Sequence, residues 1–485
     1  MLNKLHLYIQ RFNQQDEEVY KNSISNAESE AFLAQQIPLL DCPDKTLEET
    51  YYFRWWTFRK HIQNTPDGHI ITEFLPKVPW SGAYNSINCP VGFHLREGRW
   101  LKDSENILKE YIDFWLNEIG NIDCYTCWLS HAVLEYCTIK NDFAYGIACL
   151  PKLVAFFERR EKEHRRKGGI YWSHDGYDGM EYSISGPGLR PTINAYAWAD
   201  ATAIAKLAAM DGNESLRKTY EDKATEIKAA TETLLWDGAF YKTIPLKQEA
   251  DLPCLKRPKV APEHDVKELV GYIPWYFNMP PQGKESVFSE LQKDDGFYAT
   301  YGLTTAEQRH PRFMEAFDHE CLWNGPVWPF ATSQVLVAVA NLLRRYPGQV
   351  LTKQAYYEML SLYAASHRLT REDGTEQPWI DENMHPYTGR WLSRDILKSW
   401  DWRAEKGGYE RGKDYNHSLF CDLVLSGLLG IDVEDGQFTI SPLIPDDWNY
   451  FRVENLWLND KCYRITFDRD GTHYGEKTGL YIDSV

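Results

Sequence analysis

Residues 192–210 read TINAYAWADATAIAKLAAM, and apolar side chains recur in them every three or four positions. This spacing is typical of an α-helix that packs against a core. Residues 215–235, which follow after a short polar break, show the same period. Two helices in close succession predict a helical hairpin as the building unit of the fold.

Other parts of the chain repeat this pattern. Loops rich in Gly, Pro, Trp and Tyr separate the helical segments, as in residues 168–191 and 271–281, and strands do not alternate with helices. Near the C-terminus, residues 438–442 and 463–467 alternate in the manner of β-strands. The further predicted helices are residues 104–119, 145–163, 319–345, 352–365 and 418–429.

These patterns favour an all-α-dominated fold, an α/α toroid with a small C-terminal β cap. In such a barrel an inner and an outer ring of helices pack together, and loops at one end form a pocket. We expect an N-terminal helix and arm over residues 1–45, a catalytic barrel over residues 46–431 and a short β-rich segment over residues 432–485.

Composition excludes several classes of partner. The net charge of −17 and the pI of about 5.4 argue against nucleic acid or an anionic membrane surface. No apolar run reaches the roughly 18–20 residues that span a bilayer. The N-terminal residues lack a signal-peptide core, so we expect a cytoplasmic protein, or a periplasmic one if a signal peptide has been removed. Nothing in the sequence indicates the oligomeric state.

Cofactor signatures are also lacking. Cys124 and Cys127 form the only CxxC pair, and no second pair or histidine cluster completes a zinc pattern. Phosphate-binding loops, dinucleotide fingerprints and the serine-hydrolase elbow are missing too. We therefore expect neither a metal nor a cofactor.

Two acidic segments carry the chemical information. Residues 178–185 read DGMEYSIS, and residues 379–389 read WIDENMHPYTG. Each places carboxylates among aromatic side chains in a loop shaped by Gly or Pro. Aromatic faces stack on the apolar C–H surfaces of sugar rings, and cleavage of a glycosidic bond needs one protonated and one ionised carboxyl group. The two loops together predict a glycosidase site.

Glu181 is the predicted general acid, with Asp178 as the alternative. A general acid must keep its proton near neutral pH, and exclusion of water raises the pKa of a carboxyl group. An ordinary loop acid is the competing interpretation. The side chains that could wall Glu181 from water are Tyr171, Trp172, Tyr177 and Met180.

Glu382 is the predicted general base, because it lies on a different loop from the acid and could hold a water on the opposite face of the sugar. For an inverting reaction the two carboxyl groups should lie roughly 6.5–9.5 Å apart. A surface turn with ordinary acids is the competing interpretation. The alternative bases are Asp381, Glu405 and Glu410.

Residues 323–329, WNGPVWP, form a third notable segment. Trp323 and Trp328 could make a floor on which a sugar stacks, with Asn324 and Gly325 beside it. Packing against neighbouring helices is the alternative for both indoles. Further predicted substrate contacts are Tyr84, Asn85, Arg96, Glu97, Trp100, Tyr177 and Trp379.

Together these segments resemble the α-glucosidase group of glycoside hydrolase family 63, including its mannosylglycerate-hydrolase-like members, and more distantly trehalases. The resemblance covers about residues 165–430. The acid motif of that family corresponds to residues 178–183 and 189–195. Its aromatic motif W-R-G-P-x-W-P matches residues 323–329, and its base motif E-x-Y-x-P-x-T-G matches residues 382–389. Residues 270–274 and 301–305 are lesser matches. The resemblance implies an (α/α)6 barrel and an inverting mechanism.

The sequence departs from that family at three places. Glu181 stands where the family has Asp, Asn324 replaces an Arg, and the family's N-terminal Trp-Asp element is absent, which leaves Tyr84 and Asn85 as possible substitutes. These departures leave the sugar and the linkage open. The resulting expectation is an inverting exo-glycosidase for a small, α-glucoside-like carbohydrate.

Other functions remain compatible with the sequence. A glycosyl phosphorylase would use phosphate in place of the base, and a sugar-binding protein would need no catalysis. A sugar epimerase would need paired histidines, for which His174, His385 and His417 are available.

Overall fold

A computed structural model describes residues 1–484 of the chain, except residues 249, 251, 253, 349, 400–402, 435–436 and 459–460. The described part is mostly helical. Its α-helices are α1 (Leu2–Gln15), α2 (Ser29–Gln36), α3 (Lys45–His61), α4 (Val91–Gly98), α5 (Ser104–Leu116), α6 (Leu129–Lys140), α7 (Phe143–His164), α8 (Pro191–Met210), α9 (Glu214–Leu234), α10 (Ile273–Tyr276), α11 (Pro329–Arg345), α12 (Lys353–Ala365) and α13 (Leu392–Ser399).

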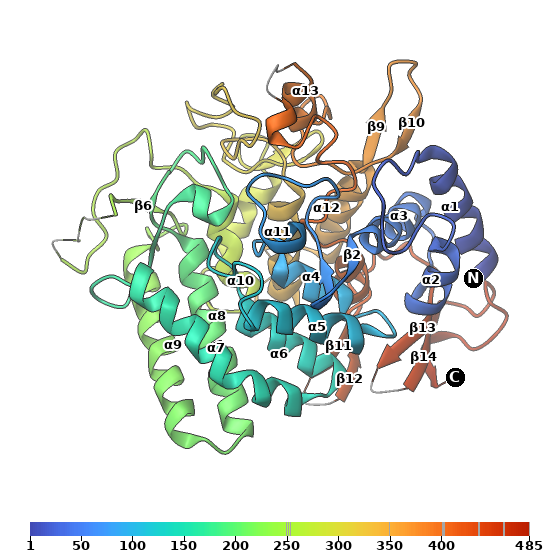
Figure 1. Ribbon diagram of the computed structural model, residues 1–485, viewed down its shortest axis with the longest axis horizontal. Helices are drawn as coiled ribbons and strands as arrows, with labels where there is room; N and C mark the ends of the chain where they lie inside the picture. Colours follow the sequence, from blue (N-terminus) through green and yellow to red (C-terminus); the bar gives the residue numbers. More distant parts are fainter. Residues whose placement is uncertain are drawn as a thin grey trace.

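Helices α8 and α9 show how the helical body is built. Nearly every residue of α8 is buried, because α6, α7, α9 and α10 all contact it. In α9 the buried side chains recur every three or four residues and form one stripe, as expected for a helix with one face in solvent. Figure 1 shows α9 at the periphery of the molecule, outside α8. Helix α11 is also buried over most of its length, between α10 and α12.

An antiparallel sheet lies beside the helical body, with the strand order β1-β13-β14-β15. Strand β1 (Leu39–Asp41) comes from the N-terminal region and pairs with β13 (Tyr450–Leu458), which brings Leu40 opposite Val453. Figure 1 shows this sheet near α1 and α2. The other two strands are β14 (Lys461–Asp468) and β15 (Gly479–Ser484).

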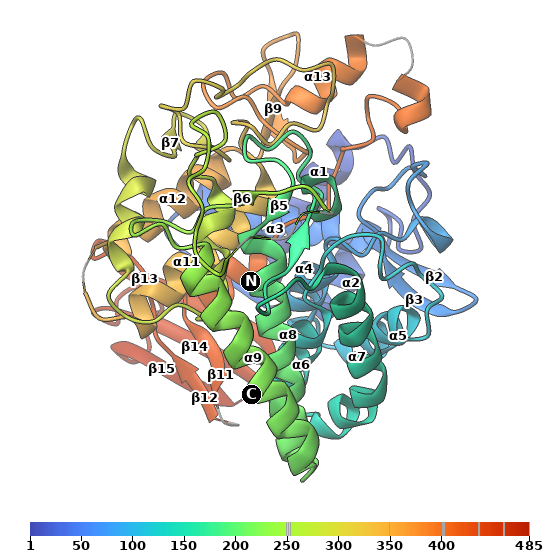
Figure 2. The same ribbon diagram turned by 90° about the vertical axis from the view of Figure 1, so that its left-hand side faces the viewer.

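The remaining strands form short hairpins and one small three-stranded sheet. Hairpin β9–β10 and helix α13 gather at one end of the molecule, at the top of both Figure 1 and Figure 2. These strands are β2 (Ile62–Thr65), β3 (Gly68–Ile71), β4 (Trp172–Ser173), β5 (Gly188–Leu189), β6 (Ile244–Pro245), β7 (Tyr298–Ala299), β8 (Gly302–Leu303), β9 (Arg368–Thr370), β10 (Glu376–Pro378), β11 (Ile431–Glu434) and β12 (Gln437–Ile440).

The structure confirms a mostly helical protein with a C-terminal antiparallel sheet. The predicted helices at 104–119, 145–163, 192–210, 215–235 and 352–365 correspond to α5, α7, α8, α9 and α12, and the predicted strands at 438–442 and 463–467 fall in β12 and β14. No described helix is long and apolar enough to cross a membrane.

Two predicted helices begin too early. The prediction of a helix from residue 319 is wrong, because α11 begins at Pro329, whose missing N–H suits the first helical turn. In the predicted helix 418–429, the regular part is a π-helical stretch, Leu423–Leu428. Gly430 ends it with a φ of +70°, where a Cβ would lie 2.0 Å from the carbonyl oxygen of Ser441.

Candidate active site

Glu181 and Glu382, which are 201 residues apart in sequence, line one cavity of about 240 Å³. We call this cavity the inner pocket. Segments from several loops surround it, and four of its side chains are carboxylic acids: Glu73, Glu181, Glu320 and Glu382. Its other lining residues are Phe74, Trp80, Ile87, Cys89, Tyr125, Gly179, His319, Cys321, Trp328, Lys406, Arg411, Tyr415 and His417.

Asp178 shapes the loop that carries Glu181. It ends a short 3-10 helix (Asp175–Asp178), and its side chain is fully buried. Its carboxylate does not line the inner pocket, because four protein donors occupy it. The donors are Thr126 Oγ1 at 2.8 Å, Ser173 Oγ at 3.1 Å, Arg190 Nε at 2.5 Å and Thr192 Oγ1 at 2.5 Å.

Glu181 has the environment of a carboxylic acid that keeps its proton. Burial raises the pKa of Glu181; the hydrogen bond from Cys321 opposes this, and the charges of Asp175 and Glu382 add to it. The Cys321 thiol donates to Glu181 Oε2 at 2.9 Å, and the main-chain carbonyl of Glu181 accepts from Trp323 N at 3.0 Å. A raised pKa is what a general acid needs near neutral pH.

Glu382 is held by a guanidinium group. Arg411 donates through Nε to Glu382 Oε1 at 2.5 Å and through Nη2 to Oε2 at 2.9 Å. This two-pronged contact fixes the orientation of the carboxyl group. It uses one lone pair of each oxygen and leaves the second lone pair of each free to accept a proton.

Arg411 also binds a second carboxylate in the inner pocket. Its Nη1 lies 2.8 Å from Glu320 Oε1, and Lys406 Nζ lies 3.3 Å from the same oxygen. Burial alone would raise the pKa of Glu320, but the nearby positive charge of Arg411 and smaller contributions from His319, backbone hydrogen bonding and Lys406 outweigh it and lower the pKa. Glu320 therefore acts as a counter-charge to Arg411 and Lys406.

Glu73 is the carboxylic acid that the sequence analysis missed. Burial and, to a smaller extent, the charges of Glu382 and Glu181 raise the pKa of Glu73 to about 8, against a lowering by the Tyr415 hydrogen bond and Arg411. Tyr415 Oη donates to Glu73 Oε1 at 3.0 Å. The sequence signal was present, because Glu73 precedes Phe74, Pro79 and Trp80 in a context like those of Glu181 and Glu382.

The tryptophans of the WNGPVWP segment are stacked on each other, with ring centroids 4.5 Å apart and an angle of 16°. Trp328 lines the inner pocket and Trp323 does not, so Trp323 supports its neighbour from behind. Asn324 and Gly325 also lie outside the lining. Asn324 Nδ2 donates to the carbonyl of Glu315 at 2.7 Å, and Gly325 N donates to Thr305 Oγ1 at 3.0 Å.

Several predicted substrate contacts lie away from the inner pocket. Arg96 and Trp100 both donate to the buried carboxylate of Asp422, at 2.8 Å each, and Glu97 accepts from the backbone N–H groups of residues 420–422. Tyr177 stacks on His164. Tyr84 is exposed and donates to Asp67. These side chains bind other parts of the protein.

The side chain of Asn85 shapes the inner pocket indirectly, by hydrogen bonds to the backbone of a neighbouring loop. Its Nδ2 donates to the carbonyls of Phe74 and Pro76, at 3.0 and 2.9 Å, and its Oδ1 accepts from Val78 N at 3.1 Å. The loop that these bonds fix contains Phe74 and Trp80, which line the inner pocket.

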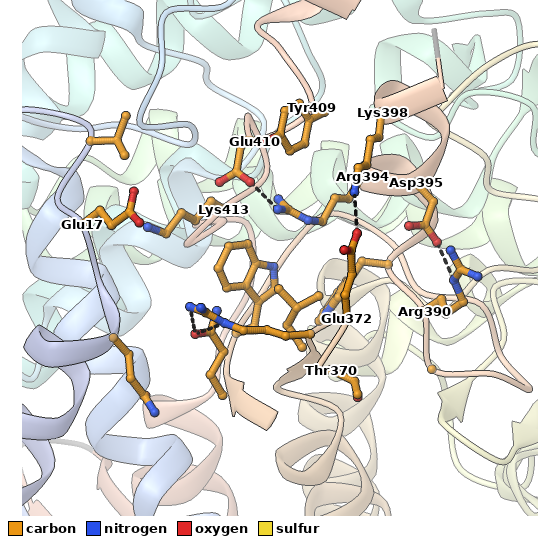
Figure 3. A pocket seen from close by; sticks show the side chains of 18 of the residues that line it. Glu17, Thr370, Glu372, Arg390, Arg394, Asp395, Lys398, Tyr409, Glu410 and Lys413 are labelled. Carbon is orange, nitrogen blue, oxygen red and sulfur yellow. Dashed lines mark hydrogen bonds and ion pairs between the residues drawn. The ribbon is translucent and has the colours of Figure 1, made fainter. Parts of the chain in front are cut away.

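A second and larger cavity, of about 910 Å³, lies behind the wall that carries Arg411; we call it the outer groove (Figure 3). Trp379 and the alternative base Glu410 line this groove and not the inner pocket. Glu410 is paired with Arg394, and Figure 3 shows the two side chains pointing toward each other. Glu405 is exposed and lines neither cavity.

The wall between the two cavities is thin. Along residues 409–417, Glu410 and Lys413 face the outer groove, whereas Arg411 and Tyr415 face the inner pocket. The alternative base Asp381 lies inside the wall, where burial and the charge of Glu382 raise its pKa to about 7. Its Oδ1 comes so near Gly412 that an added Cβ would lie 1.8 Å away.

Among the histidines proposed for an epimerase, the inner pocket contains His417, whereas His174 and His385 do not line it. Within the described residues, no three His, Cys, Asp or Glu side chains are grouped so that they could hold a metal ion.

Comparison with known proteins shows the family of the chain. The model of the mannosylglycerate hydrolase MGH1-like glycoside hydrolase domain matches residues 83–418. A solved structure named "Sialidase" is 34% identical, with a TM-score of 0.89; the match covers 100% of this chain but 43% of that one, so the chain spans less than half of that protein.

Two more distant structures share the fold. One is the family 63 mannosylglycerate hydrolase from Thermus thermophilus in complex with glucose, at 14% identity and a TM-score of 0.51, over 72% of this chain and 98% of that one. The other is a family 78 rhamnosidase from a Bacillus species, at 12% identity and a TM-score of 0.58, over 90% of this chain and 41% of that one. On the evidence of the domain match, the chain belongs to the MGH1-like glycoside hydrolase family.

Proposed function

We propose that the protein is an inverting, exo-acting glycoside hydrolase in which Glu181 is the general acid and Glu382 the general base. One observation carries the proposal: these two carboxyl groups come from loops far apart in sequence and line the same small pocket. The raised pKa of Glu181 and the guanidinium contact of Glu382 give the two carboxyl groups different environments, as an acid and a base need.

The proposed reaction needs one proton delivered and one removed. Glu181 gives its proton to the glycosidic oxygen as the bond to the anomeric carbon breaks. Glu382 takes a proton from a water that attacks the anomeric carbon from the opposite face. The products are the free sugar with inverted configuration and the alcohol that left. Arg411 binds both oxygens of Glu382 before the reaction and stays bound to it while the proton arrives.

The inner pocket supports a small substrate. Its volume of about 240 Å³ is below the roughly 300–1,000 Å³ of pockets for drug-sized ligands. Room for little more than one sugar ring favours removal of terminal residues, and Trp328 offers an aromatic surface to that ring. An α-glucoside-like sugar is the preferred version.

The charge of the inner pocket favours a neutral sugar. Its two basic side chains, Lys406 and Arg411, both pair with Glu320, and Arg411 also binds Glu382. A sugar acid such as the substrate of a sialidase would bring a further negative charge beside carboxyl groups that already engage these cations.

The proposal extends to the architecture. We propose that the hairpins of the helical body close into a six-hairpin (α/α)6 ring over residues 46–431, preceded by the N-terminal arm 1–45 and followed by the β-rich segment 432–485. The likeness in fold to the family 63 and family 78 structures supports this arrangement.

A panel of aryl and natural glycosides, with the product anomer followed by NMR, tests the function. We expect hydrolysis of a neutral α-glycoside with inversion at the anomeric carbon, and no dependence on phosphate. Retention of configuration would refute the assigned roles of Glu181 and Glu382. Turnover that requires phosphate would instead identify a glycosyl phosphorylase. Sugar binding without turnover across the panel would identify a binding protein.

A further inference from the structure

The inner pocket holds more carboxylic acids than the proposed reaction uses. Glu181 and Glu382 have the roles of acid and base, and Glu320 is the counter-charge of Arg411 and Lys406. Glu73 remains without a role, although it lines the inner pocket and is only 4% exposed. A carboxyl group is costly to bury, so its position calls for an explanation.

The two oxygens of Glu73 differ. Oε1 accepts from Tyr415 Oη at 3.0 Å and lies 3.1 Å from His417 Nδ1. Tyr415 Oη and His417 Nδ1 also contact each other, so these three polar atoms form one cluster. Oε2 has no hydrogen-bond partner in the part of the chain that the structure describes. One oxygen is thus fixed by the protein and the other is left for a ligand.

His417 gives a second, independent observation. It lines the inner pocket, is 4% exposed, and its Nε2 is buried without a hydrogen-bond partner among the described residues. Burial lowers the pKa of His417 well below its ordinary value, so the ring is neutral. The Tyr415 hydroxyl has one proton, which it donates to Glu73 Oε1, so Nδ1 carries the ring proton and donates within the cluster. Nε2 is then a buried acceptor without a partner among the described residues, and a ligand hydroxyl would satisfy it.

We propose that Glu73 determines substrate specificity: as a neutral carboxylic acid it donates a hydrogen bond from Oε2 to a hydroxyl group of a neutral sugar, and His417 Nε2 binds an adjacent hydroxyl. The proposal rests on the proposed function, because it concerns the same pocket and the same class of substrate. Glu73 has no part in bond cleavage. Its contribution is to substrate binding.

Groups from every surrounding segment act on Glu73. Burial is the largest influence and raises the pKa of Glu73 to about 8. The Tyr415 hydrogen bond and the positive charge of Arg411 oppose the rise, and the charges of Glu382 and Glu181 increase it. Below about pH 8 the group is neutral and can donate; above it, the carboxylate can only accept. The titratable groups that face Glu73 are Cys89, Tyr111, Tyr125, Glu181, Glu382, Arg411, Tyr415 and His417.

Glu73→Gln separates hydrogen-bond donation by residue 73 from other effects of pH, because an amide donates at every pH. The test substrate is a glycosyl fluoride of the sugar that the panel identifies. Because fluoride leaves with little need for a general acid, its hydrolysis does not depend on the protonation of Glu181. For the wild type we expect KM to rise about tenfold between pH 7 and pH 9, as a group with a pKa of about 8 loses its proton. For Glu73→Gln we expect a flat KM over the same range.

Glu73→Ala lacks the donor at every pH, so at pH 7 we expect its KM to be about tenfold or more above that of the wild type, and at pH 9 close to it. Circular dichroism and thermal unfolding of both variants would establish that they fold. The proposal is overturned if Glu73→Gln keeps the alkaline rise in KM, or if Glu73→Ala binds substrate as tightly as the wild type at pH 7.

Failure of the proposed function can be told apart from failure of this proposal. If no glycoside is hydrolysed, calorimetric titration of the wild type and Glu73→Gln with neutral hexoses, including D-glucose, D-mannose and L-rhamnose, replaces KM as the readout. Binding that weakens above pH 8 in the wild type alone would support the role of Glu73. Binding with the same pH dependence in both proteins, or no binding of any of these sugars by the wild type, would overturn it.

Discussion

The outer groove is almost four times as large as the inner pocket, yet its charges are the better balanced. Its lining holds five basic and four acidic side chains, whereas the inner pocket holds two basic side chains and four acids. In the outer groove Arg394 pairs with Glu410, Arg390 with Asp395 and Lys398 with Glu372, as Figure 3 shows. Half-exposed pairs of this kind contribute little to the free energy of folding.

The inner pocket differs because it is buried and has an excess of acids. Burial and the charges of neighbouring carboxyl groups raise the pKa of Glu73 and of Glu181, while Arg411 binds both oxygens of Glu382. Carboxylic acids in such different environments can give and take protons in one reaction. Buried carboxylic acids in an enclosed space therefore mark the candidate active site better than cavity size does.

The largest expected effect is that of Glu382→Gln. The amide is nearly isosteric and cannot accept a proton from the attacking water, so we expect kcat to fall by about 10²–10⁴-fold, while substrate binding changes little. Steady-state kinetics on the best substrate of the panel measures this, with Glu410→Gln in the outer groove as the matched control. A loss of less than about fivefold for Glu382→Gln would exclude it as the base.

Glu181→Gln should cost nearly as much, but only for substrates with a poor leaving group. We expect about a 10²–10⁴-fold loss in kcat/KM on a natural glycoside and less than about tenfold on the glycosyl fluoride, which needs little protonation. In the wild type, activity on the natural glycoside requires protonated Glu181, so it is present at low pH and lost as the pH rises through the raised pKa of Glu181. Equal losses on both substrates would contradict the role of acid.

Glu181 and Glu382 could be predicted as candidates from the sequence because aromatic, Gly and Pro residues surround them in short segments. The helices α8 and α9 were equally visible, since each has exposed residues at helical spacing, such as Thr202 and Lys206 in α8. Helix α3 was missed because it is buried on nearly every side and so lacks a polar stripe. A helical hydrophobic period is visible in a sequence only where one face of the helix contacts water, and α3 has almost no such face.

The side that each loop residue faces could not be predicted. Glu410, Arg411 and Lys413 are near neighbours with similar sequence context, yet the first and third face the outer groove and the second faces the inner pocket. Likewise Asp178 and Glu181 share a loop, but Arg190 and three hydroxyl groups sequester Asp178. Such choices depend on partners that are distant in sequence.

Asp178→Asn probes that sequestered carboxylate and should act on stability rather than on one chemical step. It leaves the fully buried Arg190 without its ionic partner, and breaking a buried pair costs about 3–5 kcal/mol. Urea unfolding followed by fluorescence would show a lower midpoint, with the exposed Glu163→Gln as control. If the variant is as stable as the wild type but loses activity on natural glycosides only, Asp178 would replace Glu181 as the acid.

The smallest expected effect belongs to the outer groove. Glu410→Gln removes the charge partner of Arg394, but that guanidinium also lies over the rings of Trp379 and Tyr409, so its position should persist. Since a half-exposed ion pair is worth at most about 1 kcal/mol, we expect a change of that size in the free energy of unfolding and a kcat/KM within about fivefold of the wild type. Unfolding curves and the kinetics used for Glu382→Gln measure both. The two substitutions are chemically identical and differ only in the cavity that they change. A collapse of activity in Glu410→Gln, together with a mild effect of Glu382→Gln, would therefore place the base in the outer groove.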